Sequence, residues 1–142
     1  MWWGFRIYDN QKQLRIKLES EAKLFVQDLI VNKKLKLIWS FALDFENSRN
    51  PYVAKQNVIS GFAKHSNIFV FENEEILRNA EEIEQHNIKE LDALHIACAI
   101  YSKSDYFITT DDRVLKYNDS RIKIVSPIDF IKIYEKGDES DE

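Results

Sequence analysis

Glycine, proline and cysteine are scarce in this chain of 142 residues, which has three glycines, two prolines and one cysteine. The low glycine and proline content favours long regular elements over a loop-rich fold. The lone Cys98 excludes an internal disulfide framework and a cysteine-based zinc site, and it suits the reducing cytoplasm. Cys98 lies in an apolar stretch, where we expect it to be inert packing. The length fits one domain.

The sequence also lacks the marks of a membrane or exported protein. No apolar run approaches the length of a membrane span. The N-terminal residues "MWWGFRIYDN" lack the basic start and long apolar core of a signal peptide. The net charge of −4 comes from the end "EKGDESDE", so the rest is nearly neutral, although a neutral total can hide a basic face. We therefore predict a folded domain over residues 1–134 and an acidic, disordered tail over residues 135–142.

Short apolar runs alternate with longer amphipathic segments along the chain. The runs predict strands at 35–39, 67–71, 106–110 and 121–125. The amphipathic segments predict helices at 12–34, 41–49, 51–65, 73–87, 90–104 and 126–134, with a short helix or turn at 111–119. In the first helix, Leu14, Leu18 and Phe25 recur at helical spacing. Continuous apolar strands between helices are typical of a mostly parallel sheet covered on both faces, so the expected fold class is α/β, in three α/β/α layers.

Three acidic residues fall where such strands are expected to end. Glu46 follows the strand at 35–39, Asp111 follows the strand at 106–110, and Asp92 lies in the first turn of the helix at 90–104. Functional groups of parallel sheets gather beyond the carboxyl ends of the strands. Two carboxylates about 4 Å apart repel by about 4 kcal/mol at an effective dielectric constant near 20. Converging carboxylates therefore need a cation, and Mg²⁺ or Mn²⁺ is the natural choice because hard ions prefer oxygen ligands.

Each of these residues also has a purely structural interpretation. Asp92 would complement the helix dipole, Asp111 would cap the short helix that follows it, and Glu46 would be an exposed helix acid. Asp112, beside Asp111, would be solvated or complement the same dipole. His95 lies three residues after Asp92, on roughly the same helix face, where a core or supporting role is more common than metal ligation.

Several segments together resemble the PIN domain family. They are "YDNQKQLRIKLESEA", "SFALDFENSRNP", "LDALHIACAIYSKSDYFITTDDRVLK" and "IKIVSPIDFI", and the resemblance extends from Tyr8 to Ile131. It implies an α/β fold with a central parallel sheet and the activity of a Mg²⁺- or Mn²⁺-dependent ribonuclease, as in the toxins of bacterial toxin–antitoxin pairs. The implied catalytic and metal-binding residues are Glu46, Asp92 and Asp111, with Asp112 as a possible helper. The implied partners are RNA, an antitoxin protein and a second copy of the chain.

The N-terminal segment departs from that family pattern. Family members begin with a strand that ends in an aspartate, the first metal ligand, and no such segment is recognisable before "YDNQKQLRIK". Either the natural chain begins further upstream, or the segment has been lost or replaced. In another register Phe5–Tyr8 forms the strand and Asp9 is the ligand, whereas Asp9 is otherwise a turn or cap residue. Trp2 and Trp3 would then cover the sheet or a partner surface.

Three functions are consistent with these residues. The first is a metal-dependent ribonuclease of the toxin type, supported by the acidic residues and the family resemblance. The second is a catalytically inactive PIN-like module that binds RNA or protein, supported by the missing first aspartate. A phosphatase of similar architecture is the third and the weakest, because such enzymes need a nucleophilic aspartate after the first strand.

Overall fold

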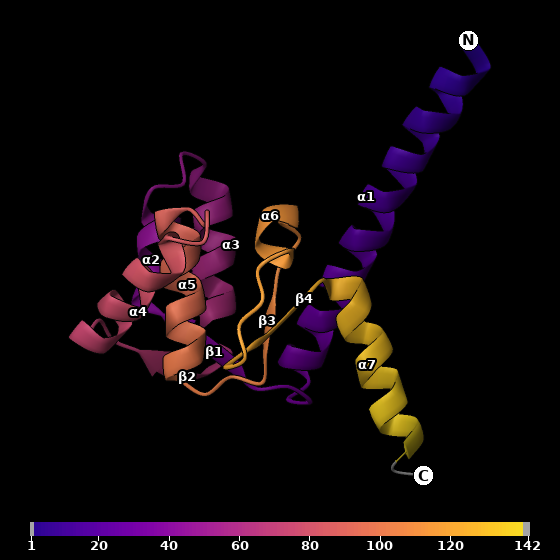
Figure 1. The fold of residues 1–142 in the computed structure, drawn as a ribbon. Coiled ribbons are helices and arrows are strands. Elements are labelled where there is room, and N and C mark those ends of the chain that lie inside the picture. The colour runs from indigo at the N-terminus through magenta and orange to yellow at the C-terminus, as the bar shows by residue number, and fades with distance from the viewer. Residues whose placement is uncertain (1, 141–142) are drawn as a thin grey trace.

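The computed structural model describes the backbone of residues 2–140 and the side chains of residues 12–137. Helices dominate, and the strands are short and parallel. Figure 1 shows three layers, with helices α2 to α5 on one side of the strands and α1 and α7 on the other. The helices are α1 (Trp2–Val31), α2 (Phe41–Ser48), α3 (Val53–Ala63), α4 (Glu74–Glu84), α5 (Glu90–Tyr101), α6 (Asp112–Leu115) and α7 (Pro127–Ser140). The α/β prediction is confirmed.

The strands pair in parallel, as their apolar sequences predicted. β1 (Leu37–Ser40) pairs with β2 (Ser66–Val70), and β3 (Tyr106–Ile108) pairs with β4 (Lys123–Val125). Within the described residues these pairs form two two-stranded sheets. Because both pairs are parallel, helices connect the paired strands: α2 and α3 lie between β1 and β2, and α6 lies between β3 and β4. The segments that directly follow β1 and β3 are where functional groups of a parallel sheet are expected.

Helix α5 connects the two sheets. It contacts β1 and β3, and it also packs against α2 and α4. Its small residues Ala93 and Ala97 are fully buried and allow this close approach, while Ile96 from the same helix and Ile76 and Ile83 from α4 fill the surrounding core. Each such fully buried aliphatic side chain stabilises the fold by about 1.5–3 kcal/mol relative to an exposed one. Helix α5 is therefore anchored in the core by Ala93, Ile96 and Ala97, the first of which directly follows Asp92.

Helix α1 differs in part from the sequence prediction. Ala22 and Val26 are buried, but Leu14, Leu18 and Phe25 are 56%, 46% and 41% exposed. The physical reason is that the helix extends past the body of the domain, so its apolar positions near the N-terminus have no neighbour to cover them (Figure 1). Phe5–Tyr8 belongs to α1, so the alternative register that made this segment a strand is wrong. The side chains of Trp2, Trp3 and Asp9 lie outside the described residues.

The C-terminal helix begins as its sequence predicted. The Asp129 amide donates a hydrogen bond of 3.1 Å to the Ser126 hydroxyl, and Pro127 occupies the first helical position. The helix continues through Ser140, into the segment assigned above to an acidic tail, and residues 141–142 lie outside the described range. Among the described residues, no helix combines the length and the apolar character that a membrane crossing requires.

Candidate active site

The three acidic residues predicted from the sequence come from three elements around the start of α5. Glu46 lies in α2, which follows β1 directly, and the buried Ser40 hydroxyl caps this helix by accepting a hydrogen bond from the Leu43 amide at 3.3 Å. Asp92 lies in the first turn of α5. Asp111 follows β3 and caps α6. Since α5 contacts β1, α2 and β3, it lies between the helix that carries Glu46 and the strand that precedes Asp111.

Electrostatics shows that these carboxylates interact. Burial raises the pKa of the Asp92 carboxyl group above its ordinary value, and the negative charges of Asp111 and Glu46 raise it further. His95 and Lys89 act in the opposite direction but do not cancel these effects. Raised carboxyl pKa values are common where like charges are held together for binding or catalysis. The start of α5 therefore carries negative charge that the described side chains leave only partly compensated.

His95 supports Glu46. Its Nε2 atom lies 2.6 Å from Oε2 of Glu46, and the His95 side chain is only 10% exposed whereas that of Glu46 is 56% exposed. The mostly buried histidine thus orients a largely solvent-facing carboxylate. The position of His95 in the sequence predicted a core or supporting role, but it did not identify Glu46 as the partner. The three-residue spacing between Asp92 and His95 indicated that His95 lies near the acidic residues, because it places both side chains on one helix face.

Asp111 has the capping role that was its structural interpretation. Its Oδ1 atom accepts hydrogen bonds from the amides of Arg113 at 2.9 Å and Val114 at 3.3 Å. The Thr109 hydroxyl in turn accepts a hydrogen bond from the Asp111 amide at 3.1 Å. Capping occupies one carboxylate oxygen and fixes the orientation of the group, so the same residue serves the local fold and contributes charge near Asp92.

Asp112 faces a different partner. Its Oδ1 atom accepts a hydrogen bond of 2.8 Å from the Arg15 guanidinium group of α1, and Asp112 is not among the charges that shift the pKa of Asp92. The structure thus separates Asp112 from Asp111 despite their adjacency. Arg15 could not be identified from the sequence, because it lies 97 residues away in the chain.

The chemical nature of the acidic residues fits a hard divalent cation, but their geometry fits one only in part. All three offer carboxylate oxygens, and the raised pKa of Asp92 reflects negative charge that a cation would relieve. Among the described residues, however, no three His, Cys, Asp or Glu side chains are grouped closely enough to hold a metal ion. Glu46 is engaged by His95 and Asp111 by the start of α6, so a shared ion would require these side chains to turn.

The class of protein defined by this fold is a three-layer α/β/α domain with carboxylates gathered beyond its parallel strands. The PIN domain family model matches residues 9–120, which is most of the chain. The chain therefore belongs to the PIN domain family, a nuclease-like family of generally divalent-metal-dependent domains. No significant match is found among the curated proteins or the solved structures.

Proposed function

We propose that this protein is a Mg²⁺- or Mn²⁺-dependent endoribonuclease of the toxin type. The supporting observation is the raised pKa of Asp92, produced by burial and by the charges of Asp111 and Glu46, in a domain of the PIN family. A fold that only needed to be stable would gain from separating these charges, so their proximity favours a role in binding a cation or a phosphate-bound cation.

Each acidic residue has a distinct part in the proposed reaction. Asp92, the most enclosed of the three, would be the central ligand, and Asp111 would supply its carboxylate from the rigid start of α6. Glu46, oriented by His95, would supply the third carboxylate or accept a proton from the attacking water. A divalent ion held by these carboxylates would supply Lewis-acid chemistry toward the scissile phosphate and the attacking water.

The test compares the purified protein with the Asp92→Asn variant on a labelled single-stranded RNA, with Mn²⁺ and with a chelator. We expect metal-dependent cleavage that falls at least about a hundredfold in the variant, because misplacing a bound group by about 1 Å already has an effect of this size. The substituted amide carries no charge, so the change removes a repulsion and should not lower the melting temperature. Asp105→Asn, at an exposed aspartate outside the site, is the matched control. Cleavage that survives both the chelator and Asp92→Asn would refute the proposed site.

A second candidate function is a catalytically inactive PIN domain that binds RNA or protein. The observation in its favour is that no metal-binding group is assembled within the described residues. This candidate predicts RNA binding without cleavage in either metal, and no measurable Mn²⁺ binding by calorimetry.

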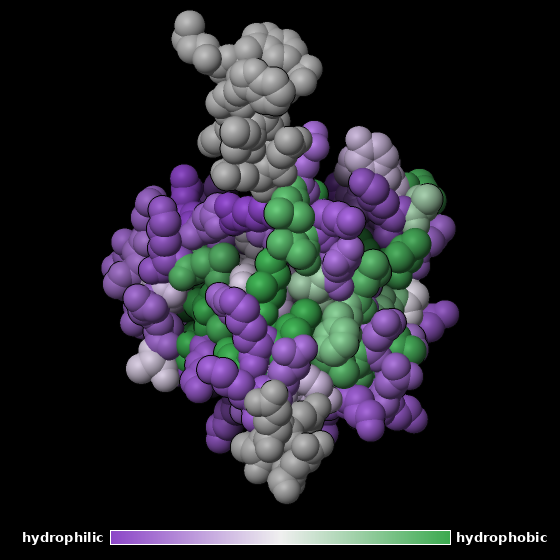
Figure 2. Space-filling view, turned by 90° about the vertical axis from the view of Figure 1, so that its right-hand side faces the viewer, coloured by the Kyte–Doolittle hydropathy of each residue, from purple (hydrophilic) through white to green (hydrophobic). Residues whose placement is uncertain are grey.

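The proposed partners follow from the toxin hypothesis and from the surface of the domain. Figure 2 shows hydrophobic surface running along the side formed by α1 and α7. Exposed apolar residues of these helices include Leu14, Leu18, Leu24, Phe25 and Ile133. We propose that this face pairs with a second copy of the chain in a cytoplasmic homodimer and that an antitoxin protein regulates it. Sedimentation as a monomer at high concentration would contradict the dimer.

The folded unit is proposed to cover residues 1–134, with residues 135–142 as an acidic extension.

A further inference from the structure

A second site lies between α6 and the turn that precedes α5. A cavity of about 360 Å³ opens between α6, the chain that follows it and the turn joining α4 to α5. Its lining consists of His86, Asn87, Ile88, Arg113, Lys116, Tyr117 and Asn118. The volume is in the range of sites that hold small ligands or parts of larger ones. Neither Glu46, Asp92 nor Asp111 belongs to this lining.

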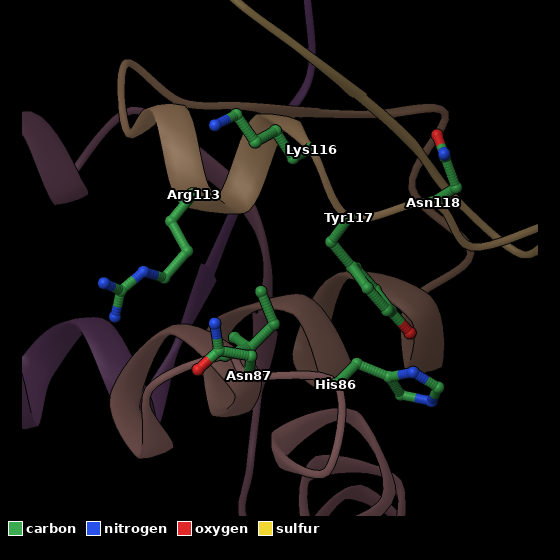
Figure 3. Close-up of a pocket in the computed structure, with 7 residues that line it drawn as sticks. His86, Asn87, Arg113, Lys116, Tyr117 and Asn118 are labelled. Carbon is green, nitrogen blue, oxygen red and sulfur yellow. The ribbon is translucent and has the colours of Figure 1, made fainter.

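The charge of this cavity is of one sign. Arg113 and Lys116 are exposed cations, and no acidic side chain lines the space. Within the part of the chain whose side chains are described, neither cation forms an ion pair, whereas Arg15 and Arg121 both do. Figure 3 shows Arg113 extending from α6 toward Asn87, with Lys116 lying along α6 at the rim. Two unpaired cations beside an open cavity favour an anionic ligand.

The cavity also contains an aromatic pair that is held in place. The Tyr117 ring lies 5.6 Å from the His86 ring, centroid to centroid, at an interplanar angle of 46°. The Tyr117 hydroxyl donates a hydrogen bond of 2.7 Å to Asp119, which is in turn bound by two guanidinium nitrogens of Arg121. Burial and the Asp119 carboxylate raise the pKa of Tyr117 to about 12, so the hydroxyl keeps its proton and this bond persists at physiological pH. The ring is therefore preorganised as a stacking surface.

We propose that this cavity binds a nucleotide of single-stranded RNA next to the cleavage site. Arg113 and Lys116 would contact its phosphate, the Tyr117–His86 pair would stack on its base, and the side-chain amides of Asn87 and Asn118 would hydrogen-bond to the base edge. The cavity neighbours the acidic residues along the chain, because Arg113 of its lining lies two residues after Asp111 and its amide donates to the Asp111 carboxylate at 2.9 Å. We therefore expect one RNA strand to reach from the cavity to the carboxylates. The identity of the ligand rests on the proposed function, but the site itself rests on the cavity, its charge and its aromatic pair.

The test measures binding of a fluorescein-labelled 12-nucleotide RNA to the full chain in the presence of a chelator, so that cleavage has no influence. The double variant Arg113→Gln, Lys116→Gln should bind about tenfold more weakly. The slope of log affinity against log salt should also become shallower by about 0.7 for each phosphate contact removed. The control variant Lys64→Gln, Lys132→Gln removes two exposed cations that do not line the cavity, and we expect it to bind like the wild type.

A second pair of variants separates stacking from charge. Tyr117→Leu should weaken RNA binding about tenfold because the stacking surface is lost, whereas Tyr117→Phe keeps the ring and should stay within about threefold of the wild type. Both variants lose the bond to Asp119, but only Tyr117→Leu also loses the ring that packs against the core, so the melting temperature of each variant is measured beside its binding. If Tyr117→Leu does not fold, the exposed Arg113 and Lys116 variants decide alone.

The outcomes distinguish this site from the proposed activity. Binding that depends on Arg113 and Lys116 in a protein that never cleaves RNA would support the cavity and refute the nuclease. No RNA binding by the wild type at low salt, or an equal loss in the Lys64, Lys132 control, would overturn the cavity proposal. Cleavage by the double variant with an unchanged KM would overturn it as well.

Discussion

Two clusters of charged and polar side chains in this domain, one around Asp119 and one around Asp92, have opposite electrostatic environments. Asp119 accepts hydrogen bonds from Arg121 and Tyr117, and these partners lower its pKa well below the ordinary value in spite of burial. Asp92 is surrounded instead by Asp111 and Glu46, and its pKa is raised. The first cluster is satisfied and contributes to stability. The second retains repulsion that an added cation would relieve, and this difference supports the proposal that Asp92 serves binding whereas Asp119 serves the fold.

The largest expected effect is a loss of RNA cleavage when Asp111 loses its negative charge but keeps its role as the cap of α6. Asp111→Asn keeps a good helix-capping residue but loses one negative charge beside Asp92. We expect RNA cleavage to fall about a hundredfold while the free energy of unfolding changes by less than about 0.5 kcal/mol. Cleavage assays and urea unfolding on the same preparation measure both quantities. A loss of stability equal to that of a missing cap, with activity intact, would make Asp111 a structural residue like Asp119.

The next effect concerns the satisfied cluster. The Asp119 side chain is 5% exposed, so Arg121→Met would leave a buried carboxylate without its main partner. We expect a loss of about 2 kcal/mol in the free energy of unfolding. Arg78→Met, at an exposed arginine in α4, is the matched control and should change stability by less than about 0.5 kcal/mol. Equal losses in both variants would show that the Asp119 cluster is not a special source of stability.

Acid should reduce the contribution of the Asp119 cluster to the free energy of unfolding, by a smaller amount than Arg121→Met does. Because the pKa of Asp119 is lowered in the folded protein, its contribution is complete above the unfolded value of about 3.9 and is lost as the pH falls through the folded value. Between pH 5 and pH 2 this loss should be on the order of 1 to 2 kcal/mol. Urea unfolding at several pH values measures it. Asp119→Asn should remove this part of the acid sensitivity, and an unchanged pH profile in that variant would contradict the assignment.

The smallest effect is expected at Asp112, the neighbour of Asp111. Its ion pair with Arg15 joins two exposed side chains, and such pairs often contribute nothing measurable. Asp112→Asn should therefore leave the free energy of unfolding unchanged and RNA cleavage within about twofold of the wild type. A large loss of cleavage would assign Asp112 to the same site as Asp92 and would contradict the proposed difference in role between Asp111 and Asp112.

The sequence by itself determined the α/β class, the parallel strands and the helices around them. Local patterns carry this information, since apolar runs such as "NIFVF" form strands, and Ser126 and Pro127 start a helix through their own chemistry. The pattern did not determine burial, because Ile68, Phe69 and Phe71 of that run are exposed and only Val70 is buried. The same patterns placed Glu46 and Asp111 after strands and Asp92 at the start of a helix. The dual capping and charge role of Asp111 was also within reach of the sequence.

Only the tertiary structure decided which side chains meet. His95 pairs with Glu46 and Arg15 with Asp112 across 49 and 97 positions of the chain, and no local pattern encodes such contacts. The contact between the Tyr117 and His86 rings is equally remote from any local pattern. The exposure of Leu14 and Leu18 likewise depends on where α1 leaves the domain, although their spacing alone suggests burial. Helical periodicity states which residues share a face, but whether that face is covered depends on the elements packed against it.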